Sequence, residues 1–511
     1  MIKTKEKIEF GDFQTPLELA KEVVSSLTIK ENYKTIIEPT CGLGNFLYAC
    51  IQEGVDPSKI QGWEINPVYV EHGNNHLNQL TGSQRIFIEQ KDFFEINWET
   101  LKASVQEPIL FLGNPPWVTN SELGKLLSKN IPKKWNFQGL TGLDAMTGKS
   151  NFDISESMLI TLLDFISGTN SSLAFLIKTS VARKLFKYIG KTKLRLSSIT
   201  IRLINAKKQF NVNVDACLFT AAGCKNPPIN YKCDVYSSIN NQRVKNTMGF
   251  SVGISDGHLV SDLNSYQKLS HIDIGCEFKW RSGVKHDASK VMEFNVNQGK
   301  LVNGLGEKVE IPYDYLYPLY KSSHISRSRL ESPSTYVLLT HKKIGDDTNC
   351  IKVISPETWN YLLMYAHILD KRKSSIYKNS PRFSVFGVGE YTFFPWKVVI
   401  SGLYKNLHFS KIGSFNNKPI VVDDTCYLLG FEQEEQADFV IKLLSSELSR
   451  KFIDSIVFLD NKRPVTVSLL NRINFRQIAR HLGQEEMFIE LFKDSYPKNG
   501  TGNREQSCIL N

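Results

Sequence analysis

The chain has 511 residues, of which 41% are hydrophobic and 22% charged, and its formal net charge is +10. This length exceeds what one hydrophobic core usually organises, so we expect at least two domains. No apolar run reaches the roughly 20 residues of a membrane-spanning helix, and residues 1–12 lack the apolar core of a signal peptide. We therefore expect a cytoplasmic protein with no membrane partner.

The cysteines indicate whether the protein is built for a reducing or an oxidising compartment. There are nine, an odd number, and they form no Cys-x-x-Cys pair. This pattern argues against a disulfide framework and against a zinc cluster. We expect reduced thiols and no metal site.

Short apolar runs alternate with helical stretches over residues 15 to about 220. Such alternation predicts an α/β fold with a mostly parallel sheet covered by helices on both faces. Ligands bind at the carboxyl ends of the strands in such sheets. The expected strands are 34–38, 59–64, 85–89, 109–113 and 173–177, and the clearest helices are 46–52 and 154–166.

A glycine-containing loop follows the first expected strand, over Glu38–Phe46. Gly42 and Gly44 let the backbone approach a ligand closely, and the next helix begins with free N–H groups. The loop is not a dinucleotide fingerprint, because no third glycine stands three residues after Gly44. A plain tight turn is the alternative.

Acidic residues end the next two strands. Glu64 lies 20 residues after Gly44 and could accept hydrogen bonds from ribose hydroxyls. Asp92 and Phe93 follow the third strand and could bind an adenine amine and pack on its ring. Each residue also has a structural interpretation, as a solvated strand end or a core side chain. Together, these features at successive strand ends predict a nucleoside-containing cofactor.

The fourth strand ends in Gly113-Asn114-Pro115-Pro116-Trp117, the strongest signal in the chain. An exocyclic adenine amine is a poor nucleophile, and acceptors aimed at its two hydrogens favour the pyramidal nitrogen formed during attack. The Asn114 side-chain oxygen and the Pro115 carbonyl could be these acceptors. Pro115 and Pro116 stiffen the loop, and Trp117 could stack on a flipped base.

In these motifs the chain resembles the gamma-class adenine-N6 DNA methyltransferases, the class that includes methylases of type II restriction–modification systems. Beyond the motifs above, Gln14-Thr15-Pro16, Ser150-Asn151-Phe152 and Lys208-Gln209-Phe210-Asn211-Val212 are also similar to motifs of this family. The resemblance covers about the first 220 residues. Trp117 departs from the family, whose commonest residue there is tyrosine.

The resemblance implies a Rossmann-like domain with a mostly parallel seven-stranded sheet, S-adenosylmethionine as cofactor, and Phe210 packing on the flipped base opposite Trp117. It implies catalytic roles for Asn114, Pro115, Pro116, Trp117 and Phe210. The implied cofactor-binding residues are Thr15, Glu38, Thr40, Gly42, Gly44, Glu64, Ile65, Asp92, Phe93 and Asn114.

The second half of the chain is basic. Residues 271–420 hold 21 Lys and Arg against 13 Asp and Glu, a net of +8, which leaves +2 for the other 361 residues. By itself this concentration fits either a polyanionic partner or a solvated basic surface with no partner. Together with the resemblance of the first half, it leads us to expect double-stranded DNA. The candidate DNA-binding residues are Lys279, Arg281, Lys321, Arg327, Lys342, Lys343, Arg372, Lys378 and Arg382.

The expected organisation is a catalytic domain over 1–222, a linker over 223–250, a β-rich target-recognition domain over 251–430, and a helical part over 431–511 packed on it. The family implies a separately encoded restriction endonuclease, and we expect a monomer. The sequence leaves open an N4-cytosine DNA methyltransferase, an RNA adenine methyltransferase, and a non-catalytic DNA-binding subunit of the same fold.

Overall fold

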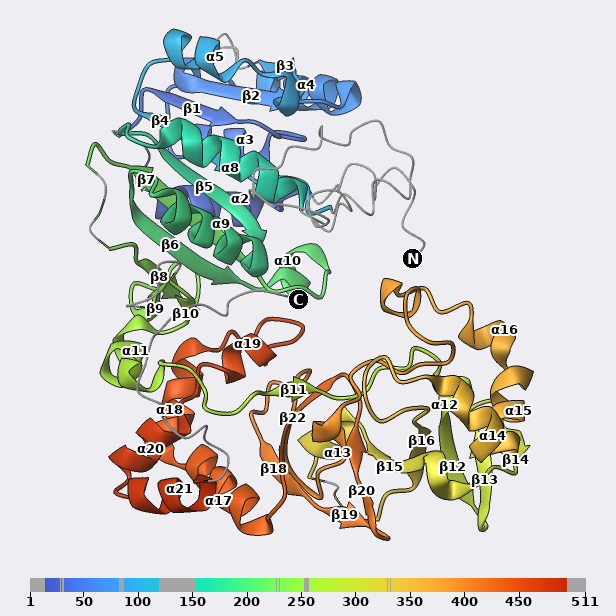
Figure 1. Cartoon of the computed structure of the whole chain (residues 1–511). Helices are drawn as coiled ribbons and strands as arrows, with labels where there is room; N and C mark the ends of the chain where they lie inside the picture. Colours follow the sequence, from blue (N-terminus) through green and yellow to red (C-terminus); the bar gives the residue numbers. More distant parts are fainter. Residues whose placement is uncertain are drawn as a thin grey trace. The chain divides into compact units, whose positions relative to one another are not determined.

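The computed structural model describes residues 14–493 except 28, 30–31, 82–86, 119–152, 227, 229, 252–256, 329 and 331. The chain forms two compact units, Met1–Asn264 and Ser265–Asn511 (Figure 1). Within the described residues, no helix is long and apolar enough to cross a membrane.

The first unit is built on a mostly parallel sheet. Strands β3-β2-β1-β4-β5 are parallel to one another, and β7 runs antiparallel between β5 and β6. This order places β1 and β4 side by side in the middle of the sheet. The bounds are β1 Thr35–Glu38, β2 Ile60–Glu64, β3 Ile88–Gln90, β4 Ile109–Gly113, β5 Ser172–Lys178, β6 Leu196–Ile204 and β7 Ala216–Gly223.

The sheet is larger than the seven strands expected. Strands β8 (Cys233–Tyr236), β9 (Val244–Phe250) and β10 (Leu259–Val260) extend it beyond β6 to ten strands. Strand β8 pairs parallel with β6 and buries Cys233 and Val235. The expectation of a linker over 223–250 is therefore wrong, because most of this segment is hydrogen-bonded into the sheet.

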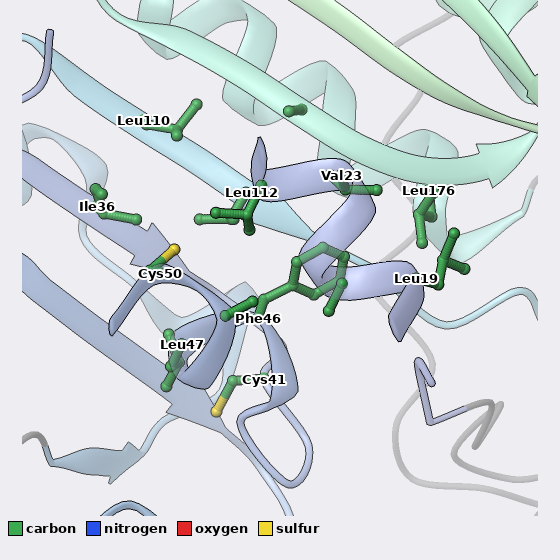
Figure 2. Close-up of a cluster of buried hydrophobic side chains, with 14 of the residues drawn as sticks. Leu19, Val23, Ile36, Cys41, Phe46, Leu47, Cys50, Leu110, Leu112 and Leu176 are labelled. Atoms are coloured by element: carbon green, nitrogen blue, oxygen red, sulfur yellow. The ribbon is translucent and has the colours of Figure 1, made fainter. Parts of the chain in front are cut away.

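Helices cover both faces, as the alternation of side chains along each strand requires. On one face α2 (Leu17–Ser26) and α3 (Asn45–Gln52) bury Leu19, Val23 and Phe46 against Ile36 and Leu112 (Figure 2). On the other, Phe111 of β4 meets Phe165 of α8 (Ile154–Ile166) edge to face. The flanking elements are α4 (Pro67–Thr81), α5 (Trp98–Ser104), α9 (Thr179–Thr192) and α10 (Ala206–Phe210).

The second unit contains two main sheets and a helical C-terminal part. One sheet has the order β11-β22-β17-β18, with β11 Arg281–Ser282, β22 Cys426–Phe431, β17 Trp396–Ser401 and β18 Phe409–Ile412. The other has the order β14-β13-β12-β16-β15-β21, from β14 Lys308–Val309 through β13 Lys300–Asn303, β12 Glu293–Asn297, β16 Thr335–Leu338 and β15 Leu316–Tyr320 to β21 Val421–Val422. The main C-terminal helices are α17 Glu434–Ser445, α18 Glu447–Ile456, α20 Phe475–His481 and α21 Glu485–Phe492, and α17 packs against β17 and β18.

Candidate active site

The glycine-containing loop joins β1 to α3 in a conformation that depends on its glycines. Gly42 has φ +53° and Gly44 has φ +80°, both in the left-handed region. A Cβ on Gly42 would stand 2.5 Å from the Gln14 side-chain oxygen. That same oxygen accepts a hydrogen bond from the Leu43 N–H at 3.2 Å. The Gln14 side chain therefore fills the space that a side chain at residue 42 would need.

Thr15 and Asn45 form a second link between the N-terminal segment and the loop. The Asn45 side-chain amide donates to the Thr15 carbonyl at 2.7 Å. Thr15 thus contributes its backbone here, and Gln14 is the residue whose side chain touches the loop. The sequence analysis named Thr15 as a cofactor-binding residue and did not single out the Gln14 side chain.

Glu38 and Thr40, at the start of the loop, carry buried polar groups. Glu38, at the end of β1, is 2% exposed, and burial followed by the nearby Glu64 carboxyl raises its pKa well above the ordinary value. Glu38 Oε2 and Thr40 Oγ1 are buried without a hydrogen-bond partner among the described residues. Buried polar atoms of this kind are rare in folded proteins and commonly mark a ligand site.

Glu64 ties the loop to the end of β2. One carboxylate oxygen accepts from the Gly42 N–H at 2.8 Å and the other from the Asn66 N–H at 2.9 Å. The predicted ribose-binding acid therefore also supports the backbone of the cofactor loop. Its neighbour Ile65 is half-buried.

Asp92 and Phe93 lie in different environments. One Asp92 carboxylate oxygen accepts from the Phe94 N–H at 2.9 Å and caps a short 3-10 helix, Phe93–Glu95. Phe93 is only 5% exposed and packs on Trp98, with centroids 4.9 Å apart. Phe93 thus has little free surface for an adenine ring, whereas the adjacent Phe94 is 42% exposed. Of the two sequence interpretations of Phe93, an adenine-packing residue or a core side chain, this packing favours the core side chain.

The predicted catalytic loop leaves β4 beside the cofactor loop. A Cβ on Gly113 would lie 3.3 Å from Glu38 Cγ and 3.4 Å from the Phe175 ring, so β4 ends in close contact with β1 and β5. Asn114 and Pro116, which follow, are half-buried, and Pro115 is buried. The neighbouring strand ends bring Asn114 and Glu38 to the same edge of the sheet.

Trp117 is anchored at both its side chain and its backbone. Its indole N–H donates to the Leu176 carbonyl at 3.1 Å, and the Lys178 ammonium donates to the Trp117 carbonyl at 3.0 Å. Its ring meets the Phe210 ring edge to face, with centroids 5.2 Å apart. The structure therefore brings together the two aromatic residues that the sequence pairs. It also shows Lys178, which the sequence analysis did not single out, because the contact spans 61 residues of chain. Ser150, Asn151 and Phe152 lie outside the described residues.

The nine candidate DNA-binding residues fall into three groups. Four side chains are exposed and form no ion pair with any described residue: Lys279, Arg327, Lys342 and Lys378. Three have acidic partners: Lys321 with Glu293, Lys343 with Glu390, and Arg382 with Asp370. The last two have aromatic partners: Arg281 over Tyr391, and Arg372 over Tyr377.

Of the nine candidates, Arg372 has the surroundings that argue most strongly against a role in DNA binding. Its guanidinium donates to the backbone carbonyls of Leu369, Ser384 and His286. It also stacks 3.8 Å from the centroid of the Tyr377 ring, and burial lowers its pKa. With most of its donors engaged, Arg372 serves mainly to hold the loop around residue 384. No cluster of metal-ligating side chains is present in the described part of the chain.

Comparison with known proteins decides the family. No protein-family model matches the chain. The type II methyltransferase M.NspV from Nostoc sp. (strain ATCC 29411 / PCC 7524) is 43% identical over 486 residues, which cover 93% of this chain and 98% of that protein. The chain belongs to the type II methyltransferase family. A second type II methyltransferase, M.VspI from Vibrio sp. (strain 343), is 31% identical to this one over 124 residues, 24% of this chain and 27% of that protein.

A solved structure has the same fold as this methyltransferase. The type IIL restriction–modification enzyme MmeI, solved in complex with DNA, matches with a TM-score of 0.53 over 97% of this chain and 70% of that one. The two sequences are 11% identical. The first unit thus carries a methyltransferase-like sheet, and further β-rich sheets follow it.

Proposed function

We propose that this type II methyltransferase transfers a methyl group from S-adenosylmethionine to N6 of an adenine flipped out of double-stranded DNA. The observation that carries the proposal is the junction at Gly113. There the Asn114–Trp117 loop leaves β4 in van der Waals proximity to Glu38, at the start of the glycine loop. A methyl donor bound at the glycine loop and a methyl acceptor held by the Asn114–Trp117 loop would lie side by side.

The residues of the glycine loop fit this cofactor. S-adenosylmethionine supplies an electrophilic methyl group on a sulfonium, and the molecule also carries an ammonium group. Buried Glu38 and Glu64 make this edge of the sheet acidic, which favours a cationic ligand. Glu38 Oε2 and Thr40 Oγ1 offer buried acceptors, and the exposed Phe94 ring lies next to Asp92. The carboxylate of Glu64, at the end of β2, is the kind of group that binds ribose hydroxyls in such sheets.

The catalytic loop would act by orientation. The Asn114 side-chain oxygen and the Pro115 carbonyl would accept the two hydrogens of the adenine amine and favour its pyramidal form. The amine loses its proton after it gains the methyl group, so no base with a shifted pKa is needed. Trp117 and Phe210 would pack on the extruded base.

The second unit would hold the DNA. Its exposed Lys279, Arg327, Lys342 and Lys378 suit phosphate contacts, which position a protein without reading sequence. We also propose that the protein acts as a monomer in the cytoplasm, beside a separately encoded restriction endonuclease. Residues 1–222 would form the catalytic part, and the target-recognition part would lie in the second unit.

The test of the reaction is direct reading of modified bases. The full chain is expressed in a methylase-free host, and its plasmid DNA is sequenced by a long-read method that detects modified bases. N6-methyladenine in one short motif is the expected result. N4-methylcytosine would keep the fold and overturn the base, and unmodified DNA would favour an RNA substrate or a binding subunit.

A single substitution tests the role of the catalytic loop. Asn114→Ala removes one of the two proposed acceptors, and loss of one preorganised hydrogen bond costs roughly 100-fold or more in rate. Methyl transfer from labelled cofactor should fall by at least that factor, while DNA binding in a gel shift stays near wild type. Equal loss of both would refute the assigned role.

A further inference from the structure

An ion pair at the end of β5 contacts the catalytic loop. The Lys178 ammonium donates to the Trp117 carbonyl at 3.0 Å and to an Asp153 carboxylate oxygen at 2.6 Å. The Lys178 side chain is 20% exposed and that of Asp153 is 6% exposed. Both bonds are therefore largely shielded from water, where charge-assisted hydrogen bonds are stronger than at the surface.

Asp153 is itself held in place by the start of α8. Its other carboxylate oxygen accepts from the Ser155 N–H at 3.2 Å and from the Ser155 hydroxyl at 2.6 Å, which caps the helix. The next residue, Ile154, donates its N–H to the Val118 carbonyl at 2.9 Å. The carboxylate cannot turn away from Lys178 without breaking this cap. The ammonium is thus aimed by a rigid element.

The same end of β5 also holds the Trp117 side chain. The indole N–H donates to the Leu176 carbonyl, two residues before Lys178 on the same strand. The loop is therefore secured at three successive points, namely the Trp117 ring, the Trp117 carbonyl and the Val118 carbonyl. On its other side it leaves β4 at Gly113, which pairs with Phe175 of β5. Asn114 and Pro115 lie between these anchors.

The charges of the pair also suit the site. A lone ammonium would supply the hydrogen bond to Trp117 but would repel a cationic cofactor and a positive charge on the attacked amine. Asp153 offsets that charge at 2.6 Å. The pair therefore supplies a strong donor without adding net charge.

We infer that Lys178 and Asp153 are positioning residues that hold the Asn114–Trp117 loop in its reactive geometry. This inference rests on the proposed function of the loop. A displacement of about 1 Å in a catalytic group can cost on the order of 100-fold in rate. Loss of the Lys178 donor should therefore lower the rate of methyl transfer more than it lowers the affinity for either substrate.

The chain offers a matched control close by, between α8 and α9. Lys184 of α9 forms an ion pair of the same length, 2.6 Å, with the buried Glu156 of α8. No bond from Lys184 to the catalytic loop occurs among the described residues. Lys178→Met and Lys184→Met therefore each remove one lysine paired with a buried carboxylate at the N-terminal end of α8, and only the first releases the loop.

The experiment compares the full-length wild type, Lys178→Met, Lys178→Arg, Asp153→Asn and Lys184→Met. Single-turnover methyl transfer to the DNA motif found by sequencing is measured beside the Kd of cofactor and of DNA. Lys178→Met should transfer about 100-fold more slowly, with both Kd values changed by less than about threefold. Lys178→Arg should recover most of the rate, because it keeps a charged donor. Lys184→Met should keep the wild-type rate, and an equal loss in both methionine variants would overturn the inference.

A second readout does not depend on the reaction. Amide hydrogen exchange in the peptide spanning residues 112–118 should quicken in Lys178→Met and stay unchanged in Lys184→Met. If the wild type methylates no adenine, the proposed function fails, and the exchange result still decides whether Lys178 holds the loop. If Lys178→Met does not fold, Asp153→Asn decides the matter, because asparagine can still cap α8 while it removes the charge. A wild-type rate and wild-type exchange in Asp153→Asn would then overturn the inference.

Discussion

The ring of Phe210 meets the ring of Trp117 edge to face, with centroids 5.2 Å apart and an angle of 68° between the planes. A base stacked between two parallel rings needs about 3.5 Å on each side, or about 7 Å in all. The rings must therefore separate before an adenine can lie between them. Trp117 is tied to Leu176 and Lys178, whereas Phe210 is half-buried at the end of the five-residue helix α10. Phe210 is thus the ring expected to move.

Phe210→Ala should weaken capture of the flipped base. A base–aromatic contact contributes about 1–3 kcal/mol, so kcat/KM should fall by roughly 5- to 150-fold. The measurement is methyl transfer at low DNA concentration, with thermal melting to verify folding. Phe87→Ala, which removes a 56% exposed phenylalanine before β3, is the control. A kcat/KM equal to that of the control would show that Phe210 does not contact the base.

Cofactor binding should release a proton from Glu38. Burial and the Glu64 carboxyl raise the pKa of Glu38, so the free protein keeps this carboxyl protonated to an unusually high pH. A bound cation lowers that pKa, and affinity should therefore increase with pH until Glu38 ionises in the free protein as well. Titration calorimetry of S-adenosylmethionine in buffers of different ionisation enthalpy measures the proton. Glu38→Gln should abolish the release, and an unchanged release in that variant would assign the proton to another group.

Gly42→Ala should weaken cofactor binding, whereas backbone strain at a glycine outside the site should not. The φ of +53° costs a non-glycine residue about 1–2 kcal/mol, and the new Cβ would also collide with Gln14. Cofactor Kd should rise tenfold or more. Gly306→Ala is the matched control, because its φ is +84° and nothing lies within 4 Å of the added Cβ. It should lose similar stability in denaturant melts and keep the wild-type Kd.

The sequence predicts the central strands well for a physical reason. Parallel strands covered on both faces bury nearly every residue, so β1, β4 and β5 stand out as apolar runs. The added strands β8 and β9 lack that signal, since β9 begins with the exposed Val244 and Lys245. They join the sheet because β8 pairs with β6 and β9 pairs with β8, and no local sequence pattern predicts this pairing.

The candidate site also contains some features that the sequence predicts and others that depend on tertiary packing. The order of strands and motifs predicts that the ends of β1, β2 and β4 meet, and the family resemblance pairs Trp117 with Phe210. The sequence left Phe93 open between an adenine-packing residue and a core side chain, and it did not predict that Lys178 contacts Trp117. Those contacts join residues from separate elements, and their partners depend on packing. Likewise, sequence charge alone did not separate the exposed Lys279 from the ion-paired Arg382.

Lys397 should make the second unit more stable as pH rises. Its side chain is fully buried in β17, with its ammonium on the Phe394 carbonyl at 2.6 Å, and burial lowers its pKa to about 7. The unfolded chain has an ordinary lysine pKa near 10.4. Between about pH 7 and pH 10 the unfolded state therefore binds more protons, so the free energy of unfolding increases with pH.

Lys397→Met should remove this dependence. At pH 7–8 the variant should be more stable than wild type by roughly 3–4 kcal/mol, and the difference should shrink toward pH 10. Urea unfolding of both proteins across this range measures it. Parallel pH profiles for the two proteins would show that Lys397 stays charged in the folded state.

DNA binding should depend on salt through the exposed cations of the second unit. Each phosphate contact contributes about 0.9 to the slope of log affinity against log salt concentration. Changing Lys279, Arg327, Lys342 and Lys378 together to glutamine should therefore lower the slope by up to about 3.6. Gel shifts or fluorescence anisotropy over a range of salt concentrations measure it.

The control changes the same number of charges at other places on the same unit. Lys343, Arg382, Lys451 and Arg480 are exposed and each pairs with an acidic side chain. Replacing these four with glutamine should lower the slope much less, because their charges are already partly neutralised and their donors engaged. A similar loss of slope in both quadruple variants would mean that net charge alone attracts the DNA. If the DNA affinity of the wild type did not depend on salt concentration, phosphate contacts would not contribute to binding.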